Sequence, residues 1–182
     1  MKILLAVLIS CLAYLSTGSE SNLYYIVSSS VKFRSEAPQE VISAESNKML
    51  GVIDISKRTF AFTVQNSSFQ GFNSALQRVH FNENYMESDV YPLTTFKGKI
   101  IEDVNFSVPG IYNVRAKGYL TVHGIVKERI IRAQVTVGTD NIKVLSNFPV
   151  LLKDHNIRVP KVVHEKIASE IKVTVEVELK KK

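Results

Sequence analysis

The feature that most constrains the fold is a two-residue alternation of apolar and polar side chains, repeated along much of the chain. From Tyr112 to Val122, every second residue is apolar or small, and the residues between them are polar or aromatic. Successive side chains of a β-strand point to opposite faces, so this pattern indicates a strand with one buried and one wet face. The same alternation is found over residues 60–64, 95–100, 142–150 and 171–179. We therefore expect a chain built mainly from strands.

The connections between these segments favour antiparallel pairing. Turn-forming residues stand at 56–58, 108–110 and 138–140. Parallel strands would instead need crossovers of about a dozen residues or more. About eight strands without regular helices between them predict one all-β domain, either a sandwich or a closed barrel. Closure would remove the edges through which long strands otherwise aggregate.

Two segments depart from the strand pattern. Phe72, Leu76 and Val79 have helical spacing after a serine or asparagine that can cap a helix, which predicts one amphipathic helix over residues 72–85. A proline marks the entry to a second, short C-terminal helix, expected over residues 161–169.

The first 18 residues have the pattern of a secretory signal peptide: a basic start, an apolar run and then small residues. The mature domain would then be residues 19–182. A second interpretation places Cys11, the single cysteine, at a lipoprotein cleavage site and lipidates it. Cleavage after Gly18 would instead leave a mature chain with no cysteine for disulfide or thiol chemistry.

The net charge allows contact with an anionic surface. The whole chain carries a formal charge of +6, part of it in the tail at residues 180–182. A basic exported protein could touch a membrane surface peripherally, although a solvated tail accounts for the same charge.

Small residues lie on the apolar side of several expected strands. A barrel of about eight strands is near the size at which its interior is either filled by side chains or left to hold one ligand. Small inward residues favour a cavity, whereas each glycine alone could instead mark a close approach of two backbones. The small residues in question are Gly98, Ala116, Gly118, Ala133 and Ser146.

A hollow interior lined by rings could bind a long hydrocarbon, because burying apolar surface contributes about 25 cal/mol per Å². Each candidate could equally pack in an ordinary core. The residues expected to line the lumen or its mouth are Phe33, Phe60, Phe62, Phe69, Phe72, Leu76, Phe81, Phe96, Tyr112, Leu120 and Phe148.

Signatures of catalysis are not found in the sequence. Its four histidines do not form a His-x-x-x-His pair, and it has no Gly-x-Ser-x-Gly elbow and no phosphate-binding glycine loop. Basic residues do not alternate with aromatic ones as in nucleic-acid readers. We therefore expect a protein that is not an enzyme, with no metal, no cofactor and no nucleic-acid partner.

Two alternatives remain at this stage. One is a structural or interaction barrel with a filled core, in which Gly98→Leu or Gly118→Leu would destabilise the fold by overpacking. The other is a metal- or quinone-linked enzyme that uses His80 with Tyr85 or Tyr91, which would require these groups to converge in one pocket.

The order of several short motifs resembles the YceI-like family. Residues 84–89 form an acidic turn that leads to Tyr91-Pro92 and then to a Thr-Phe strand at residues 95–98. Residues 118–127, GYLTVHGIVK, match the family's Gly-x-Leu-Thr hairpin. The resemblance extends from about Val31 to Leu179.

The resemblance implies an antiparallel, eight-stranded, lipocalin-like β-barrel that is exported to the periplasm. It also implies a polyisoprenoid or similar amphiphilic lipid in the pore, with a carrier, storage or isoprenoid-quinone-related role. The loop at residues 154–156 and the stretch 160–169 are longer than the common C-terminal part of the family. The family is functionally diverse, so the identity of the lipid does not transfer.

Overall fold

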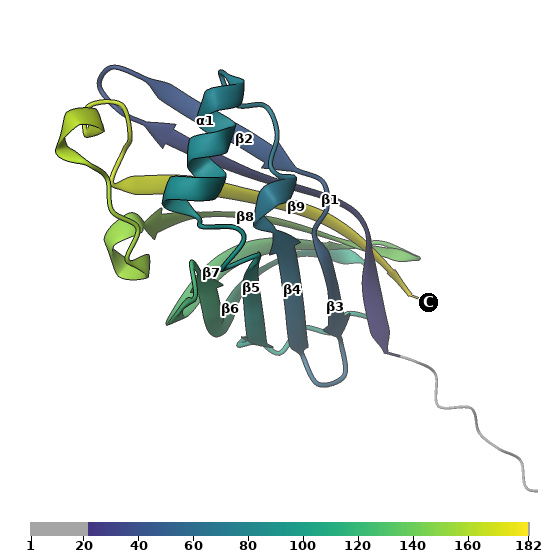
Figure 1. The fold of residues 1–182 in the computed structure, drawn as a ribbon. Coiled ribbons are helices and arrows are strands. Elements are labelled where there is room, and N and C mark those ends of the chain that lie inside the picture. Colours follow the sequence, from purple (N-terminus) through teal and green to yellow (C-terminus); the bar gives the residue numbers. More distant parts are fainter. Residues whose placement is uncertain (1–21, 182) are drawn as a thin grey trace, which may run out of the picture.

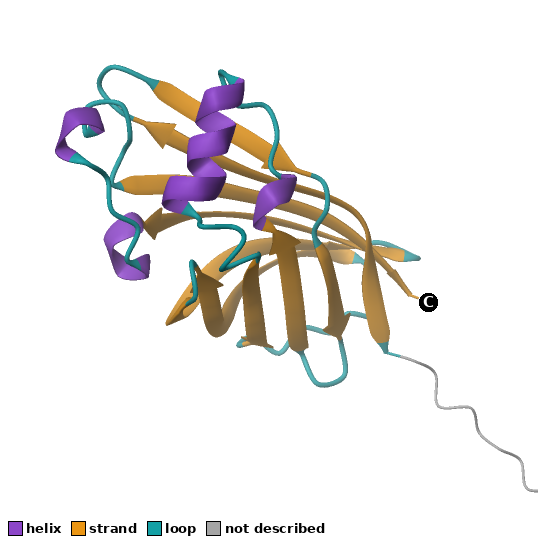
Figure 2. Ribbon diagram, in the orientation of Figure 1, coloured by secondary structure: helices purple, strands orange, loops and turns teal. Residues whose placement is uncertain are grey.

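The sheet closes on itself to form a barrel (Figures 1 and 2). The computed structural model describes residues 22–181; the expected signal peptide and Cys11 lie outside these residues. The sheet order is β2-β1-β3-β4-β5-β6-β7-β8-β9, and β9 also pairs with β1. The strands are β1 Leu23–Glu36, β2 Val41–Ser46, β3 Leu50–Asp54, β4 Thr59–Gln65, β5 Leu93–Ile100, β6 Gly110–Val122, β7 Ile125–Val137, β8 Asn141–Leu151 and β9 Glu170–Lys181.

Strand β1 is shared between two neighbours, which explains why nine strands make an eight-stranded barrel. Its residues 31–36 pair with β2, and its residues 23–25 pair with β3 on the same side. Strands β2 and β3 therefore occupy consecutive parts of one position in the barrel. Every pairing is antiparallel, so the expected antiparallel eight-stranded barrel is confirmed.

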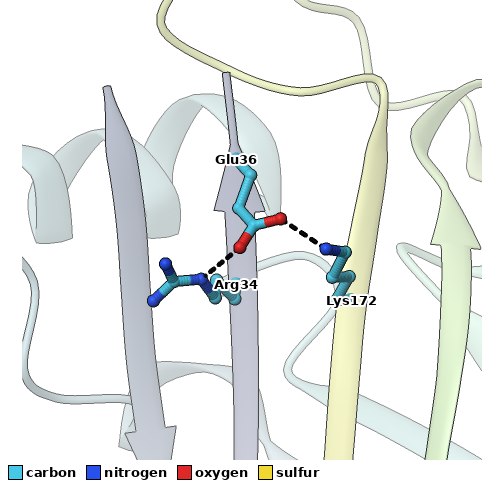
Figure 3. Close-up of polar contacts among 3 residues, drawn as sticks. All are labelled: Arg34, Glu36 and Lys172. Atoms are coloured by element: carbon cyan, nitrogen blue, oxygen red, sulfur yellow. Dashed lines mark hydrogen bonds and ion pairs between the residues drawn. The ribbon is translucent and has the colours of Figure 1, made fainter. Parts of the chain in front are cut away.

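The seam between β1 and β9 closes the barrel. It runs from Tyr24 opposite Lys181 to Ser35 opposite Ile171, with one irregularity near Ile26. Figure 3 shows Glu36 bridging this seam: it accepts from Arg34 at 2.6 Å and from Lys172 on β9. These two partners, Lys172 first, lower the pKa of the Glu36 carboxyl.

The alternation seen in the sequence matches the burial of the strands. In β6, Val114, Leu120 and Val122 are buried, whereas Asn113 and Lys117 are exposed. Strands β4, β8 and β9 show the same pattern with their expected inward rows. One face of the closed sheet is therefore apolar and points to the barrel interior.

The two ends of the barrel differ. At one end, here called the closed end, the strands are joined at residues 55–58, 101–109 and 138–140. Val137, Ile142 and Leu179 pack together there, and Ile142 and Leu179 are 1% and 0% exposed. The other end, the mouth end, carries the long insertions 66–92 and 152–169.

The insertion between β4 and β5 contains the first expected helix. Helix α1, Ala75–His80, is capped by Ser74, whose hydroxyl oxygen accepts from the backbone N–H of Gln77 at 3.1 Å. The chain continues as a π-helical turn, η2, over Phe81–Tyr85. A 3₁₀ turn, η1, precedes α1 at Asn66–Ser68.

The second expected helix, over residues 161–169, is present only as the 3₁₀ turn η4 at Lys161–Val163. The backbone beyond it makes a few local hydrogen bonds, such as that from Lys166 N–H to the carbonyl of Val163 at 2.9 Å, and it also bonds to the β1–β2 hairpin. The carbonyl of Glu165 accepts from the N–H of Gln39 at 2.9 Å, and Ala168 N–H donates to the Ser35 hydroxyl at 2.9 Å. These tertiary hydrogen bonds hold the segment as turns instead of one continuous helix.

The remaining 3₁₀ turn, η3, spans Leu152–His155 beside β7. Of the helices between residues 22 and 181, none combines the length and the hydropathy needed to cross a bilayer.

Strands β7 and β8 are paired over only part of their length. The ladder joins residues 134–137 to residues 142–145 and then ends, although both strands continue toward the mouth end. Beyond it, side chains make the connection: the guanidinium of Arg129 donates to the carbonyl of Pro149 at 2.9 Å, and the Ser146 hydroxyl donates to the carbonyl of Arg132 at 2.7 Å.

Gly98 and Gly118 mark a close approach of β5 and β6. The two residues lie directly opposite each other in the ladder. A Cβ on Gly98 would lie 2.5 Å from the Cα of Gly118 and would overlap the carbonyl of Lys117. The close-approach interpretation therefore holds for both glycines, and they do not widen the lumen. Leucine at either position would clash with backbone whether the interior is hollow or filled.

His155 fastens the β6–β7 hairpin at the mouth end. The hairpin turns at His123-Gly124, with φ values of 49° and 71°, as a two-residue turn of the primed type. His155 is 0% exposed, and its Nδ1 lies 3.2 Å from the carbonyl oxygen of Ile125. Burial lowers the pKa of His155, while the hydrogen bond to Ile125 opposes this shift.

Gly98→Ala should lower the free energy of unfolding by about 2–3 kcal/mol, because the added methyl group forces β5 and β6 apart. Gly110→Ala is the matched control, since the nearest atoms to its Cβ would belong to the Tyr112 side chain, at 3.4 Å. Urea unfolding of both variants measures the difference. Equal stability of the two variants would contradict the close approach.

Acidification should weaken the fold through His155. Because its pKa is lowered in the folded protein, the unfolded chain binds a proton there first as the pH falls below about 6.5. The resulting loss is at most about 1.4 kcal/mol per pH unit and is absent at higher pH. Urea unfolding at about pH 7.5 and pH 5.5 should show a smaller loss for His155→Gln than for the wild type. Identical pH dependence would refute this role.

Candidate functional site

The barrel interior holds a cavity of about 260 Å³. Inward side chains of β1 and of β4 to β9 form most of its wall. Strands β2 and β3 add one residue each, Ile42 and Ile53. Toward the closed end, its lining residues Val135 and Val177 join the packed cluster that contains Ile142. The interior is thus filled at the closed end and hollow toward the mouth end.

The insertions of the mouth end cover the cavity. Phe81 and Tyr85 of η2 and Met86 after it line the cavity from one insertion, and Ile157 and Ile167 line it from the other. A molecule that enters from the mouth end therefore meets both insertions.

The cavity wall is almost wholly apolar. No Asp, Glu, Lys, Arg or His is among the described residues that line it. The polar side chains there bond mostly to protein: the Asn66 amide donates to the carbonyl of Tyr91 at 2.6 Å and accepts from Thr94 at 2.8 Å. The hydroxyls of Ser35 and Ser146 are engaged by backbone groups. Such a wall favours a hydrocarbon over a polar guest.

Nine of the residues expected to line the lumen do lie at the cavity. Seven of them form two aromatic groups, and Leu120 and Phe148 lie apart from these groups. Contact of the nine with a ligand stays a prediction. In the deeper group, the ring centroid of Phe60 lies 4.9 Å from that of Phe96 and 5.5 Å from that of Phe62. In the group near the mouth, Phe33 stacks on Phe81 at 5.2 Å. The nine are Phe33, Phe60, Phe62, Phe69, Phe72, Phe81, Phe96, Leu120 and Phe148.

Leu76 and Tyr112 do not line the cavity, which corrects the prediction for both. Leu76 is 62% exposed, because α1 turns this side chain to solvent and no residue of α1 is buried. Tyr112 has the expected inward direction but lies too near the closed end. Its ring packs on the cluster there, and its hydroxyl donates to the carbonyl of Val108 at 2.9 Å.

Of the five small residues, three line the cavity: Ala116, Ala133 and Ser146. The sequence did not reveal the contributions of Ile157 and Ile167, because these residues lie in irregular backbone where no periodicity assigns a side chain to a face. Tyr85 also reaches the cavity, and burial raises the pKa of its phenol.

The groups proposed for an enzyme do not converge. His80 is exposed on α1, and the ring of Tyr91 packs edge-on against His123, with centroids 4.6 Å apart. Only Tyr85 lines the cavity. Over residues 22–181, no three His, Cys, Asp or Glu side chains are placed to hold a metal ion together.

Comparison with known proteins points to one family. The YceI-like domain matches residues 26–179. No curated protein matches the sequence. The fold is similar to that of BcnA from Burkholderia cenocepacia, with a TM-score of 0.68 and 15% identity, covering 82% of this chain and 95% of that one.

Two further structures share the fold. A polyisoprenoid-binding domain from Saccharophagus degradans, implicated in plant cell wall breakdown, has a TM-score of 0.72 and 11% identity over 87% of this chain and 98% of that one. The YCEI protein of Campylobacter jejuni has a TM-score of 0.57 and 18% identity over 74% and 81%. At these identities the structures show the fold, whereas the domain match covers most of the sequence. The chain belongs to the YceI-like family.

Proposed function

We propose that this protein binds a long-chain isoprenoid or a similar amphiphilic lipid in its barrel, as a carrier or store, and that it does not catalyse a reaction. The observation that carries the proposal is the cavity: it is enclosed by the barrel, lined by aromatic and aliphatic side chains, and free of charged residues among those described.

The energetics suit a hydrocarbon tail. Burying roughly 300 Å² of apolar surface would contribute about 7 kcal/mol, from which the cost of ordering the chain is subtracted. The volume of about 260 Å³ is slightly below the usual range of ligand pockets, which begins at about 300 Å³. A long lipid would therefore fill the cavity and leave its polar head at the mouth end.

The relatives support the isoprenoid class. The Saccharophagus degradans domain, which shares this fold, is described as binding polyisoprenoids. An isoprenoid tail is flexible and unsaturated, and it fits a wall of phenylalanine rings. An isoprenoid quinone has the same tail with a polar ring as its head, and it belongs to the same proposed class.

The direct test is mass spectrometry of organic extracts from the purified protein, together with uptake of a long isoprenoid alcohol. Ala133→Phe should reduce the uptake about tenfold or more, because the added ring would occupy part of the cavity and remove apolar contacts that the tail would otherwise make. Ala61→Phe is the matched control, since Ala61 lies on the outer face of β4 and is exposed.

The results separate this proposal from a filled barrel. Loss of uptake in Ala133→Phe alone supports a ligand in the cavity. Repeated absence of bound lipid in extracts, with no uptake by the wild type, overturns the proposal and favours an interaction barrel.

We also propose export through cleavage of residues 1–18. The support is the sequence pattern of this segment. Intact-mass measurement of the protein from its own cells should give a chain that begins at Ser19. A mass that includes a lipidated Cys11 would instead assign a membrane anchor, and an uncleaved chain would refute export by this route.

A further inference from the structure

Helix α1 presents its apolar side chains to solvent. Leu76 and Val79 are one turn apart and are 62% and 43% exposed. An amphipathic helix normally places this face on the core, and a helix this short gains little stability of its own. Exposed apolar groups that gather in one place commonly mark an interaction surface.

The β1–β2 hairpin joins α1 to the second insertion. On one side, the Asn73 amide donates to the carbonyl of Val41 at 2.9 Å, and the Gln77 amide donates to Glu40 at 2.5 Å. On the other side, the N–H of Gln39 donates to the carbonyl of Glu165 at 2.9 Å. Three successive hairpin residues thus hold both insertions at the mouth end (Figure 1).

The second insertion adds a further exposed apolar side chain. Val162 in η4 is 90% exposed, and Val41 at the start of β2 is 42% exposed. We use the name mouth surface for these apolar residues and the cations beside them: Val41, Leu76, Val79, Val162, Arg78, Lys161 and Lys166.

The cations of the mouth surface are exposed, and one of them, Arg78, also donates to the carbonyl of Ser67 at 3.3 Å. None of the ion pairs among residues 22–181 involves Arg78, Lys161 or Lys166. By contrast, Glu36 holds the nearby seam cation Lys172, as Figure 3 shows. Two carboxylates close to the insertions accept from amides: Glu40 from Gln77, and Glu165 from Gln39. Glu83 and Asp89 of the first insertion are exposed carboxylates, so the cations of the mouth surface lie beside negative charge as well.

The segments that carry the mouth surface also contribute to the wall of the cavity. The chain that carries Leu76 and Val79 runs directly into Phe81, which lines the cavity. The chain that carries Val162 runs into Ile167, which also lines it. The same two segments therefore contact the interior on one side and expose apolar groups on the other.

We propose that the mouth surface docks on an anionic lipid bilayer. Its apolar side chains would enter the headgroup boundary, and its cations would pair with lipid phosphates. Docking there brings the cavity entrance to the source of the lipid. Docking stands on its own observations, whereas transfer of lipid into the cavity rests on the proposed function.

The test compares two variants with the same change in charge. Leu76→Asp with Val162→Asp alters the mouth surface. Val108→Asp with Ile111→Asp alters the closed end, where these residues are 49% and 66% exposed. Co-sedimentation is measured with vesicles of phosphatidylcholine mixed with phosphatidylglycerol and with vesicles of phosphatidylcholine alone.

The wild type should bind the mixed vesicles and bind phosphatidylcholine alone much more weakly. The mouth variant should lose binding to the mixed vesicles about tenfold or more, while the closed-end variant stays close to the wild type. Equal losses in the two variants, or equal binding to both vesicle types, would overturn the proposal. So would self-association of the wild type that the mouth variant abolishes, because it would assign the surface to a second copy.

Uptake of an isoprenoid alcohol added from ethanol without vesicles keeps the two proposals apart. The mouth variant should retain this uptake, since its cavity lining is unchanged. Vesicle binding by the wild type without any such uptake would defeat the proposed function and leave docking supported.

Discussion

The pairing of β1 with β9 is the interaction on which the rest of the structure depends. An open sheet with this alternation would expose one apolar face and two unpaired edges. Closure through the seam between Tyr24 and Ser35 turns that face inward and satisfies both edges with each other. The cavity exists because a barrel of eight positions is slightly too wide for the side chains that Ala116, Ala133 and Ser146 provide.

The different ends of the barrel follow from the lengths of their connections. Connections at the closed end leave the inward rows to meet one another, so Val137, Ile142 and Leu179 fill the space. At the mouth end, two long insertions lie over the strands. They supply apolar side chains to the cavity wall and also expose apolar side chains to solvent. One end thus stabilises the fold, and the other end carries the features that a ligand or membrane would meet.

The alternation was sufficient to locate β4, β5, β6, β8 and β9 and to place Phe60, Phe62, Phe96 and Phe148 on the inner face, because period two assigns each side chain to a face. The alternation does not show how far along the barrel axis a side chain lies. The position of Tyr112 at the closed end therefore could not be predicted from the sequence. Helical spacing similarly identified an apolar face that includes Leu76, but not which direction α1 would turn it. The helix expected over residues 161–169 was wrong beyond Val163, because some of the backbone partners of this segment, Gln39 and Ser35, are distant in sequence.

The short ladder between β7 and β8 gives the barrel one side that is easier to spread than the β1–β9 seam. Past residues 134 and 145, side-chain hydrogen bonds from Arg129 and Ser146 connect these strands, in place of a backbone ladder. Separating the strands there costs two such bonds, whereas at the β1–β9 seam it would break a ladder that extends from Tyr24 to Ser35. If the cavity binds a lipid as proposed, a bulkier guest would splay the wall locally at this side and leave intact the seam that holds the barrel together.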